Sequence, residues 1–343
     1  SSSDTISNCT IRRSYYGVDC AGTAAPVLTN TSIEAATQTP IVLDFTATPV
    51  LSSLVFSSAN NGYDAFGLRG ATLTSGTVAT LPKRGATVGA NPLANVTYVL
   101  FGSLTINAGA SLTIDPGVVI KPTAAYTLNV FGNLTMNGTA AVGDTITITS
   151  IHDDNFGFPG DTNNNGSITA PARGNWGYVY FNQGATGSVI RTRLKFGTTS
   201  AALGQITMFN NSIPVSNCLL SDAGHGLAIL GISNPAITDV AINNGTSTPI
   251  LMSVSANPTF TNISFLANAI TALGLNGESI AVDSHIFFRD VAGYTNITYY
   301  LMNGSVQMLS PAILTIDPGV VIKNQLSGGG FINSQSRGAG RGG

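Results

Sequence analysis

One polar loop of this sequence carries residues whose types and spacing suit a metal ion. Asp161, Asn163 and Asn165 stand at alternate positions, Gly166 follows, and the main-chain carbonyl of Ser167 comes next. This is the first half of a D-x-[DN]-x-[DN]-G calcium loop, because carboxylate and carbonyl oxygens at alternate positions are ligands that Ca²⁺ prefers. The sequence therefore predicts a Ca²⁺ site in this loop.

The calcium motif is incomplete at its far end. Ala172 stands where such a loop carries a bidentate Glu, so Asp153 or Asp154 would have to supply that carboxylate. A site with so few carboxylates is expected to bind weakly, with a Kd of about 10⁻⁴ to 10⁻³ M, as in extracellular modules. The alternative is an Asn- and Gly-rich loop that holds no ion.

Residues that commonly perform catalysis are few and scattered. The chain has only Glu34 and Glu278 as glutamates, and its 3 histidines stand at unrelated positions. The signatures of serine hydrolases, zinc proteases and nucleotide-binding loops are absent. We therefore predict no catalytic residues and a protein that is not an enzyme. The open alternative is a polysaccharide-binding or polysaccharide-cleaving protein, with four charged candidates: Asp153, Asp154, Asp161 and Arg173.

The elements that must position these residues belong to a tandem array. The segment 110–121 returns almost unchanged as 312–323, an offset of 202 positions. Ser7-Asn8-Cys9 recurs as Ser216-Asn217-Cys218, 209 positions later. Repeated sequence at a fixed spacing is the primary sign of a repeat architecture.

The positions of these repeats divide the chain into one complete module and two partial ones. Residues 1–85 are predicted to be the C-terminal part of one β-helix module. Residues 86–290 form a complete module, with the calcium-type loop at 153–167. Residues 291–343 form the N-terminal part of a further module, which ends in a Gly-rich tail. In that tail, 327–330 and 336–343 have the composition of flexible linkers.

A finer period divides each module into coils. Asn217, Asp239 and Asn262 follow one another at steps of 22 and 23 residues, beside short segments that alternate apolar and polar residues. Asn8 and Asn30 keep the same spacing in the first module. Such alternation is typical of half-buried strands, and this period predicts a β-solenoid, whose coils bury a shared core by stacking. We expect these Asn and Asp side chains to stack in an internal turn.

The solenoid interpretation predicts inward columns of side chains along the axis. In the first module the columns are Cys9, Thr31 and Leu54, and Ile11, Ile33 and Phe56. In the second they are Cys218, Val240 and Ile263, and Leu220, Ile242 and Phe265. About 13 to 15 coils with a rise of about 4.8 Å per coil predict a rod on the order of 60 to 70 Å long.

The three cysteines are expected to be buried thiols. Cys9 and Cys218 occupy equivalent inward positions, and Cys20 aligns with the apolar Ile229. A free cysteine behaves as a small hydrophobic residue. A bridge between Cys9 and Cys20 remains open, because pairing depends on a geometry that the sequence does not give. Trp176 is expected to be a packing residue, with stacking on a sugar as the alternative.

Composition excludes some partners and favours others. Charged residues make up 9% of the chain, the net charge is −2 and no basic run exceeds two residues, so nucleic acid is not expected as a partner. No apolar run approaches the roughly 20 residues that a membrane helix needs. Eleven Asn-x-Ser/Thr sequences favour an extracellular protein. The candidates for glycosylation in loops are Asn137, Asn244 and Asn303.

Several segments together resemble a known kind of repeat. They are Gly102–Lys121, Leu128–Thr139, Ile148–Ser150, Gly160–Asn163 and Gly174–Gly177. Over residues 85–200, and in the flanks by module homology, they resemble the right-handed parallel β-helix repeats of large secreted or cell-surface bacterial and archaeal proteins of the adhesin or fibre type. The resemblance implies a stalk, adhesin or fibre role outside the cell and a calcium-stabilised loop at 160–163. It carries over no catalytic residues.

We therefore predict an all-β, right-handed parallel β-helix that is extracellular or on the cell surface. Strand edges without caps template further stacking, so we expect the rod to continue axially as a homopolymer or as further modules of the same chain. Surface glycans are a second class of partner. Insertion into a membrane is not expected.

Overall fold

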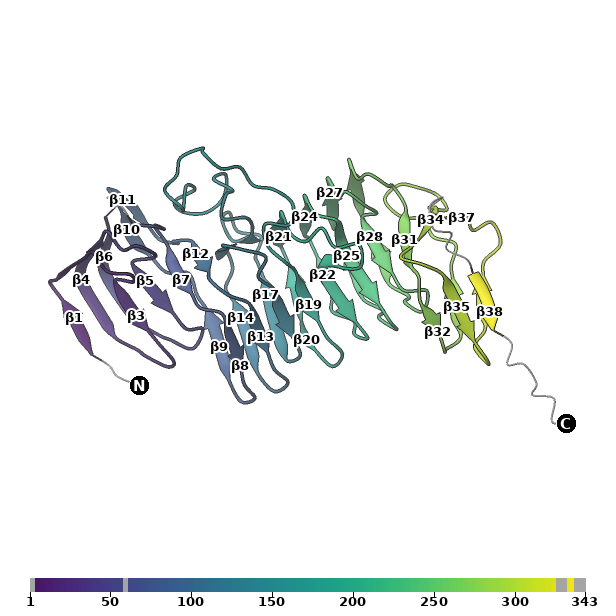
Figure 1. The fold of residues 1–343 in the computed structure, drawn as a ribbon, viewed down its shortest axis with the longest axis horizontal. Coiled ribbons are helices and arrows are strands. Elements are labelled where there is room, and N and C mark those ends of the chain that lie inside the picture. Colours follow the sequence, from purple (N-terminus) through teal and green to yellow (C-terminus); the bar gives the residue numbers. More distant parts are fainter. Residues whose placement is uncertain (1–3, 58–60, 325–331, 336–343) are drawn as a thin grey trace.

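The chain forms a long stack of short strands. The computed structural model describes residues 4–57, 61–324 and 332–335, so the predicted linkers at 327–330 and 336–343 lie outside the described residues. Strands of successive coils pair in parallel and build a β-solenoid of about 13 turns, without a helix among the described residues (Figure 1). The predicted all-β solenoid is confirmed.

Six sheets hold the described strands. Sheet A contains β1 (Thr5–Ser7), β2 (Thr10–Arg12), β4 (Val27–Glu34), β6 (Val50–Phe56), β10 (Ala86–Val88) and β11 (Asn91–Leu93). Sheet B contains β3 (Val18–Cys20), β5 (Ile41–Leu43), β7 (Phe66–Leu68), β12 (Tyr98–Leu100), β15 (Val119–Pro122), β18 (Ile146–Ile148), β21 (Thr192–Lys195), β24 (Leu219–Ser221), β27 (Ala241–Asn243) and β30 (Ser264–Leu266).

The other sheets contain the remaining strands. Sheet C contains β8 (Ala71–Leu73), β13 (Leu104–Ile106), β16 (Leu128–Val130), β19 (Val179–Phe181), β22 (Gly204–Phe209), β25 (His225–Leu230), β28 (Ile250–Met252), β31 (Leu273–Asn276), β34 (Tyr299–Met302) and β37 (Ile322–Asn324). Sheet D contains β9 (Val78–Leu81), β14 (Ser111–Ile114), β17 (Asn133–Asn137), β20 (Thr186–Ile190), β23 (Val215–Ser216), β26 (Ala236–Thr238) and β29 (Thr259–Thr261). Sheet E contains β32 (Ser279–Ile280), β35 (Val306–Leu309) and β38 (Ile332–Gln335), and sheet F contains β33 (Ser284–Ile286) and β36 (Leu314–Ile316).

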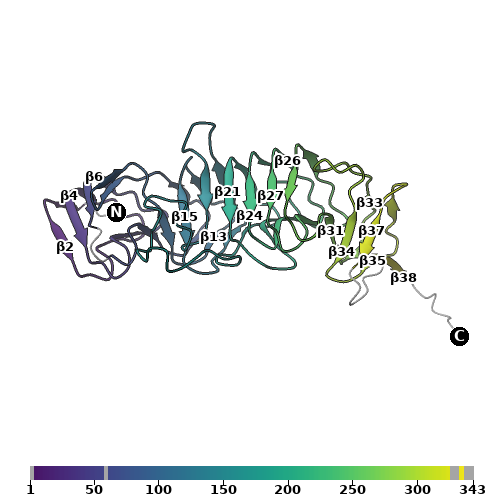
Figure 2. The same cartoon turned by 90° about the horizontal axis from the view of Figure 1, so that it is seen from above.

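The core lies inside the stack and follows the predicted columns. Ile33 pairs in register with Ile11 on one side and Phe56 on the other. In the second half of the chain, Ile242 lies in the same way between Leu220 and Phe265. Their strands β24, β27 and β30 are neighbours in sheet B, and Figure 2 shows β24 and β27 side by side. Each fully buried side chain of this size contributes about 1.5–3 kcal/mol to folding. The inward columns are therefore confirmed wherever a coil is covered on both sides.

The first column departs from the prediction at its end. Thr31 and Leu54 are buried, but Cys9 is exposed, and its thiol donates to the carbonyl of Ser7 at 2.9 Å. Cys9 lies in the first described coil, where a neighbouring coil covers the column from one side only. The prediction of three buried thiols is therefore wrong for Cys9. It is confirmed for Cys20 and Cys218, and all three thiols are free.

The predicted Asn and Asp positions form a turn, but not an internal one. Asn8, Asn30, Asn217, Asp239 and Asn262 have φ angles between 48° and 55°, in the left-handed region that Asn and Asp tolerate. The amide of Asn30 donates to Asn8 at 2.8 Å, and that of Asn262 donates to Asp239 at 2.5 Å. The stacking is confirmed, whereas all five side chains are exposed. At each corner, the Asn or Asp with positive φ points its side chain outward, and the strand segments before and after it point their apolar side chains inward.

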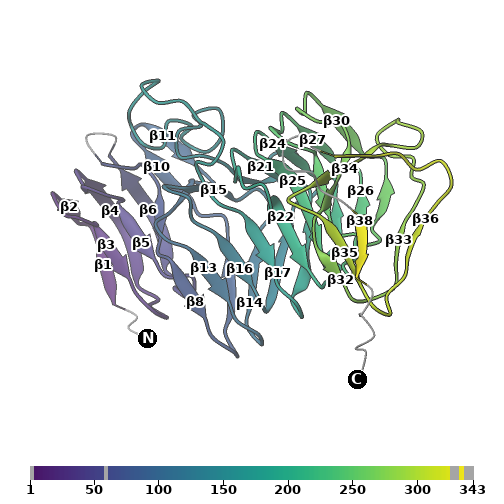
Figure 3. The ribbon, with the colours of Figure 1, turned by 45° about the vertical axis from the view of Figure 1, so that its right-hand side comes forward.

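The sheets are interrupted at two places along the rod. At the first, sheet A ends in the antiparallel pair β10–β11, sheets C and D begin at β8 and β9, and sheet B continues from β7 to β12. At the second, sheets B and D end at β30 and β29, sheets E and F begin, and sheet C continues from β31 to β34. Strands β32, β35 and β38 of sheet E lie at the C-terminal end of the rod (Figure 3). One sheet therefore crosses each interruption unbroken.

Candidate functional site over sheet B

A long loop lies outside the solenoid over sheet B. It joins β18 to β19 and comprises residues 149–178, which we call the strap (Figure 1). Near its middle, the carbonyl of Thr162 accepts from the main-chain N–H of Asp64, just before β7, at 3.0 Å. Near its end, Arg173 donates to the carbonyl of Asn244, just after β27, at 2.9 Å. Six pairings of sheet B separate these coils, so the strap extends over about 29 Å, at about 4.8 Å per coil.

A buried lysine fastens the strap to the sheet. Lys121 of β15 is fully buried, and its Nζ donates to the carbonyl of Gly160 at 2.6 Å and to Oγ1 of Thr162 at 2.9 Å. Burial lowers the pKa of Lys121 to about 8, although the carboxylates of Asp153 and Asp154 favour its charged form. Because a buried ammonium needs hydrogen-bond partners, the lysine and the strap depend on each other for their position.

Two carboxylates of the strap hold its own backbone. Asp161 accepts from the N–H of Asn165 at 3.1 Å and from the N–H of Gly166 at 2.8 Å. Asp153 is fully buried and accepts from Oγ1 of Thr149 at 2.5 Å. The two contacts of Asp161 close the loop at 161–166, and the contact of Asp153 fixes the start of the strap.

Three oxygens of the strap are buried and have no hydrogen-bond partner. They are Oδ1 of Asp154, Oδ1 of Asn163 and Oδ1 of Asn165. An unpaired buried acceptor costs about 1–3 kcal/mol, and each of these three oxygens is free to accept a further contact. Burial raises the pKa of Asp154, and the negative charge of Asp161 raises it further. A cation bound to Asp154 would favour its charged form.

The predicted calcium ligands are thus unequal. Asp161, Asn163 and Asn165 lie in one loop, and Asp154 has the free oxygen that the incomplete motif lacks, whereas the oxygens of Asp153 already have partners. Ser167 is exposed at the end of the loop. No three His, Cys, Asp or Glu side chains of the described residues gather as metal ligands. A cation here would depend on amide and main-chain oxygens, as the sequence motif implies.

A hollow borders the loop on the side of the first sheet interruption. It has a volume of about 580 Å³ and lies between the β10–β11 hairpin and the strap. Asp64, Asp161 and Asn164 face it beside apolar residues of the hairpin, among them Leu93. Solvent therefore has a route to the carboxylate of Asp161.

Three of the four residues proposed for polysaccharide chemistry already have partners, and Asp154 keeps one unpaired oxygen. Asp153 is buried and bonded, Asp161 holds the loop, and Arg173 is bonded to Asn244. Trp176 is fully buried and donates from Nε1 to the carbonyl of Lys195 at 2.6 Å, which confirms it as a packing residue. The sequence analysis identified the loop of the strap but did not predict a role for Lys121, because a lysine that follows an apolar run gives no sign that it is buried.

The glycosylation candidates occupy different surroundings. Asn137 closes strand β17 instead of lying in a loop, is half-buried, and accepts from Oγ of Ser188 at 2.9 Å. Asn244 and Asn303 are exposed outside the strands. Of the three, Asn244 and Asn303 are the more accessible acceptors, and glycosylation remains a prediction for all of them.

Comparisons with known proteins identify no family for the chain. No family model matches it, and no curated protein matches it. A solved structure of a TibC-catalyzed hyper-glycosylated TibA55-350 fragment matches with 12% sequence identity and a TM-score of 0.24, covering 97% of this chain and 100% of that one. At this TM-score the likeness supports no conclusion about the chain. Within the described ranges, no helix has the length and apolar character needed to cross a membrane.

Proposed function

We propose that the chain is a structural, extracellular β-solenoid protein that forms a surface stalk, fibre or filament. It extends along its axis by stacking of copies, by head-to-tail association, or as further modules of the same polypeptide. The observation that carries this proposal is the coil itself, which adds about 4.8 Å to the rod for every 22 or 23 residues and buries its apolar face only against the next coil.

The ends of the described stack support axial association. Sheet B starts at β3, and sheets C and E end at β37 and β38, so these strands each present one edge to which no described strand is hydrogen-bonded. Such edges are templates for another strand. At the same two ends, apolar side chains of other strands are only partly covered, for example Ile11 in β2 and Leu314 in β36. A further coil would complete both the hydrogen bonds and the core.

The extracellular location rests on the chemistry of the surface. Charged residues make up only 9% of the chain, and Ser, Thr, Asn and Gly supply most of its polarity, which gives it many neutral hydrogen-bonding groups. Exposed Asn-x-Ser/Thr sequences, such as those at Asn244 and Asn303, are acceptors for glycans in secreted proteins. Together these features suit a rod displayed outside the cell.

We also propose that the strap binds one Ca²⁺ weakly and that the ion stiffens the rod. The proposed ligands are Asp161, Asn163, Asn165, the carbonyl of Ser167 and Asp154. Support comes from the three unpaired oxygens and from the compact loop that Asp161 holds. Because the strap extends over six pairings of sheet B, ordering it would fasten several coils to one another.

Two charge variants in one strand test the fibre. Ile11 faces the core at the end of the stack and Thr10 faces solvent, both in β2. Purified protein at rising concentration should give rods or fibres in electron microscopy. Ile11→Lys places a charge in the stacking surface and should stop elongation, while Thr10→Lys should not. Compact, monodisperse monomers of the unmodified chain at high concentration would refute the fibre.

The same purified protein also tests the alternative of a polysaccharide-cleaving protein. Incubation with acidic polysaccharides, with and without calcium, should release no new reducing or unsaturated ends. Release of such ends, lost in Arg173→Ala, would favour a polysaccharide-cleaving protein over a structural one.

A further inference from the structure

The two interruptions of the sheets repeat the same tyrosine contact. At the first, the hydroxyl of Tyr98 donates to the carbonyl of Pro82 at 2.7 Å, and at the second the hydroxyl of Tyr299 donates to the carbonyl of Phe287 at 2.7 Å. Both tyrosines are almost completely buried. They are also equivalent in sequence, because each is the fourth residue of a repeated Asn-x-Thr-Tyr segment.

An arginine at each interruption reaches back to the preceding coil. Arg84 donates to the carbonyl of Pro49 at 3.2 Å, and Arg289 donates to the carbonyl of Pro258 at 2.9 Å. Pro49 and Pro258 are themselves 209 positions apart, the offset of the sequence repeat. Each arginine therefore joins the last coil before the interruption to the first coil after it.

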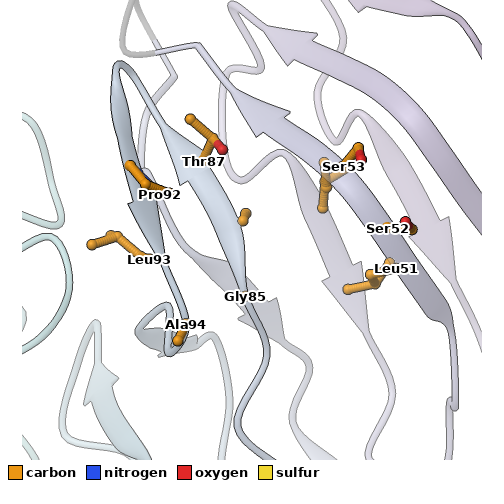
Figure 4. A pocket seen from close by; sticks show the side chains of 10 residues that line it. Leu51, Ser52, Ser53, Gly85, Thr87, Pro92, Leu93 and Ala94 are labelled. Carbon is orange, nitrogen blue, oxygen red and sulfur yellow. The ribbon is translucent and has the colours of Figure 1, made fainter.

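The break in the sheets opens the first interruption to solvent. A hollow of about 370 Å³ lies between β6 and the β10–β11 hairpin (Figure 4). Leu51 and Ser53 line it from β6, and Gly85, Thr87 and Leu93 line it from the hairpin and its entry. In the second copy a single antiparallel bridge between residues 291 and 294 stands in place of the hairpin.

Equivalent strands of the two copies lie on different faces. Strand β13 lies in sheet C, and seven pairings along that sheet lead to β34. The strand that repeats the sequence of β13 is β35, which follows β34 in the chain and lies in sheet E. Likewise β12 lies in sheet B and its repeat β34 in sheet C. One module thus makes seven turns plus one further face, which is about one third of a turn.

We propose that the interruptions are two copies of one inter-module interface, and that each module joins the next after a rotation of about one third of a turn. The partner that fits this interface is the following copy of the same module. At each interface the modules are connected by one continuous sheet, the tyrosine and the arginine. The continuous sheet is sheet B at the first interruption and sheet C at the second.

The rotation determines how a longer rod displays its straps. Successive straps emerge on successive faces, and the strap returns to its first face after three modules. This display rests on the proposed function, since it requires a rod of several modules, whereas the rotation itself does not.

Spin-label distances in the unmodified fold test the rotation. Thr105 and Tyr300 both lie in sheet C, seven pairings apart, and Gln307 is the sequence repeat of Thr105 in sheet E. Labels on Cys variants of Thr105 and Tyr300 should be about 34 Å apart along the axis, at about 4.8 Å per turn. Labels at Thr105 and Gln307 should be farther apart, because they also lie on different faces.

The native thiols do not compete with the introduced cysteines for the spin label. Cys9 is exposed and is replaced by Ser, while burial raises the pKa of both Cys20 and Cys218 to about 11, which keeps them protonated and unreactive. The exposed repeat pair Thr113 and Thr315, in sheets D and F, provides a second measurement if one variant folds poorly. It too should exceed 34 Å.

The outcomes separate the rotation from the fibre. If modules joined in phase, Gln307 would stand above Thr105 on one face, and the Thr105–Gln307 distance would be equal to or shorter than the Thr105–Tyr300 distance. That order would overturn the rotation. Absence of fibres in electron microscopy would refute the proposed self-association of copies and leave the distances in the dilute monomer unchanged.

Discussion

Replacing Lys121 with Met should loosen the strap and abolish one pH dependence of stability. The variant keeps the length and apolar stem of the side chain but removes the ammonium that donates to Gly160 and Thr162. It leaves a strap carbonyl without its donor, and at the same time it removes a charge that is buried under the strap. These two effects oppose each other.

The opposing effects are similar in size. Each hydrogen bond from a charged group is worth about 1.5–3 kcal/mol. The shift of the Lys121 pKa from 10.5 to about 8 corresponds to about 3 kcal/mol against the charged form, at about 1.4 kcal/mol per pKa unit. We therefore expect only a small change in the free energy of unfolding at pH 7, and a larger local change in the strap.

The sign of the pH effect follows from the lowered pKa. Between pH 8 and 10.5 the unfolded chain holds a proton on Lys121 that the folded chain has lost. Stability rises with pH wherever the unfolded state binds more protons, so the native protein should gain stability over this window. Lys121→Met has no such proton and should lack this part of the gain, while other titrating groups act equally in both proteins.

Denaturation followed by tryptophan fluorescence measures this directly, since Trp176 is the single tryptophan and belongs to the strap. Amide exchange of residues 149–178 should be faster in Lys121→Met than in the native protein. The matched control is Lys323→Met, because Lys323 is the sequence repeat of Lys121 and is exposed. Equal strap exchange in the native protein and Lys121→Met, together with the same rise above pH 8, would refute this role of the lysine.

Further predictions concern calcium, the core and the corner turns. Free Ca²⁺ at about ten times its Kd should stabilise the protein by about 1.4 kcal/mol in thermal melts. Asp154→Asn should remove this gain without lowering the melting temperature in chelator, and an undiminished gain in the variant would contradict Asp154 as a ligand. Phe56→Ala should lower the free energy of unfolding in urea by about 3–5 kcal/mol, and a loss below about 1 kcal/mol would mean that the column is not packed there. Asn30→Ala should lower the free energy of unfolding by about 1–2 kcal/mol more than Asn30→Gly, because both variants lose the amide contact but only Ala is strained at a φ of 48°. Equal losses in the two variants would disprove the strain.

Much of the fold was predictable because a solenoid repeats local information. The spacing of 22 and 23 residues and the alternation within each strand predicted the coil, and the columns through Ile33 and Ile242 are in register as expected. Local residues also decide the turn at Asp115-Pro116-Gly117, where Gly117 has a φ of 81°. In each case the residues that decide the structure lie within one coil or at the same position of the next.

Part of the site was predictable for the same reason. The calcium-type loop is a local pattern, and Asp161 closes it through N–H groups four and five residues away. Which of Asp153 and Asp154 keeps an unpaired oxygen was not predictable. It depends on which carboxylate finds Thr149 and Asn155 as partners, and that follows from the path of the strap over the sheet.

What the sequence alone determined is the coil: its period, its alternating strands, its corner residues and the polar loop with oxygen ligands. What only the tertiary structure decided is the environment of each copy. Lys121 and Lys323 stand in almost identical segments, yet one is fully buried under the strap and the other is exposed. Repeated segments also fall in different sheets, since β12 lies in sheet B and the strand that repeats its sequence, β34, lies in sheet C. Burial and position around the axis depend on neighbouring coils that are distant in sequence, and local residue patterns carry no information about them.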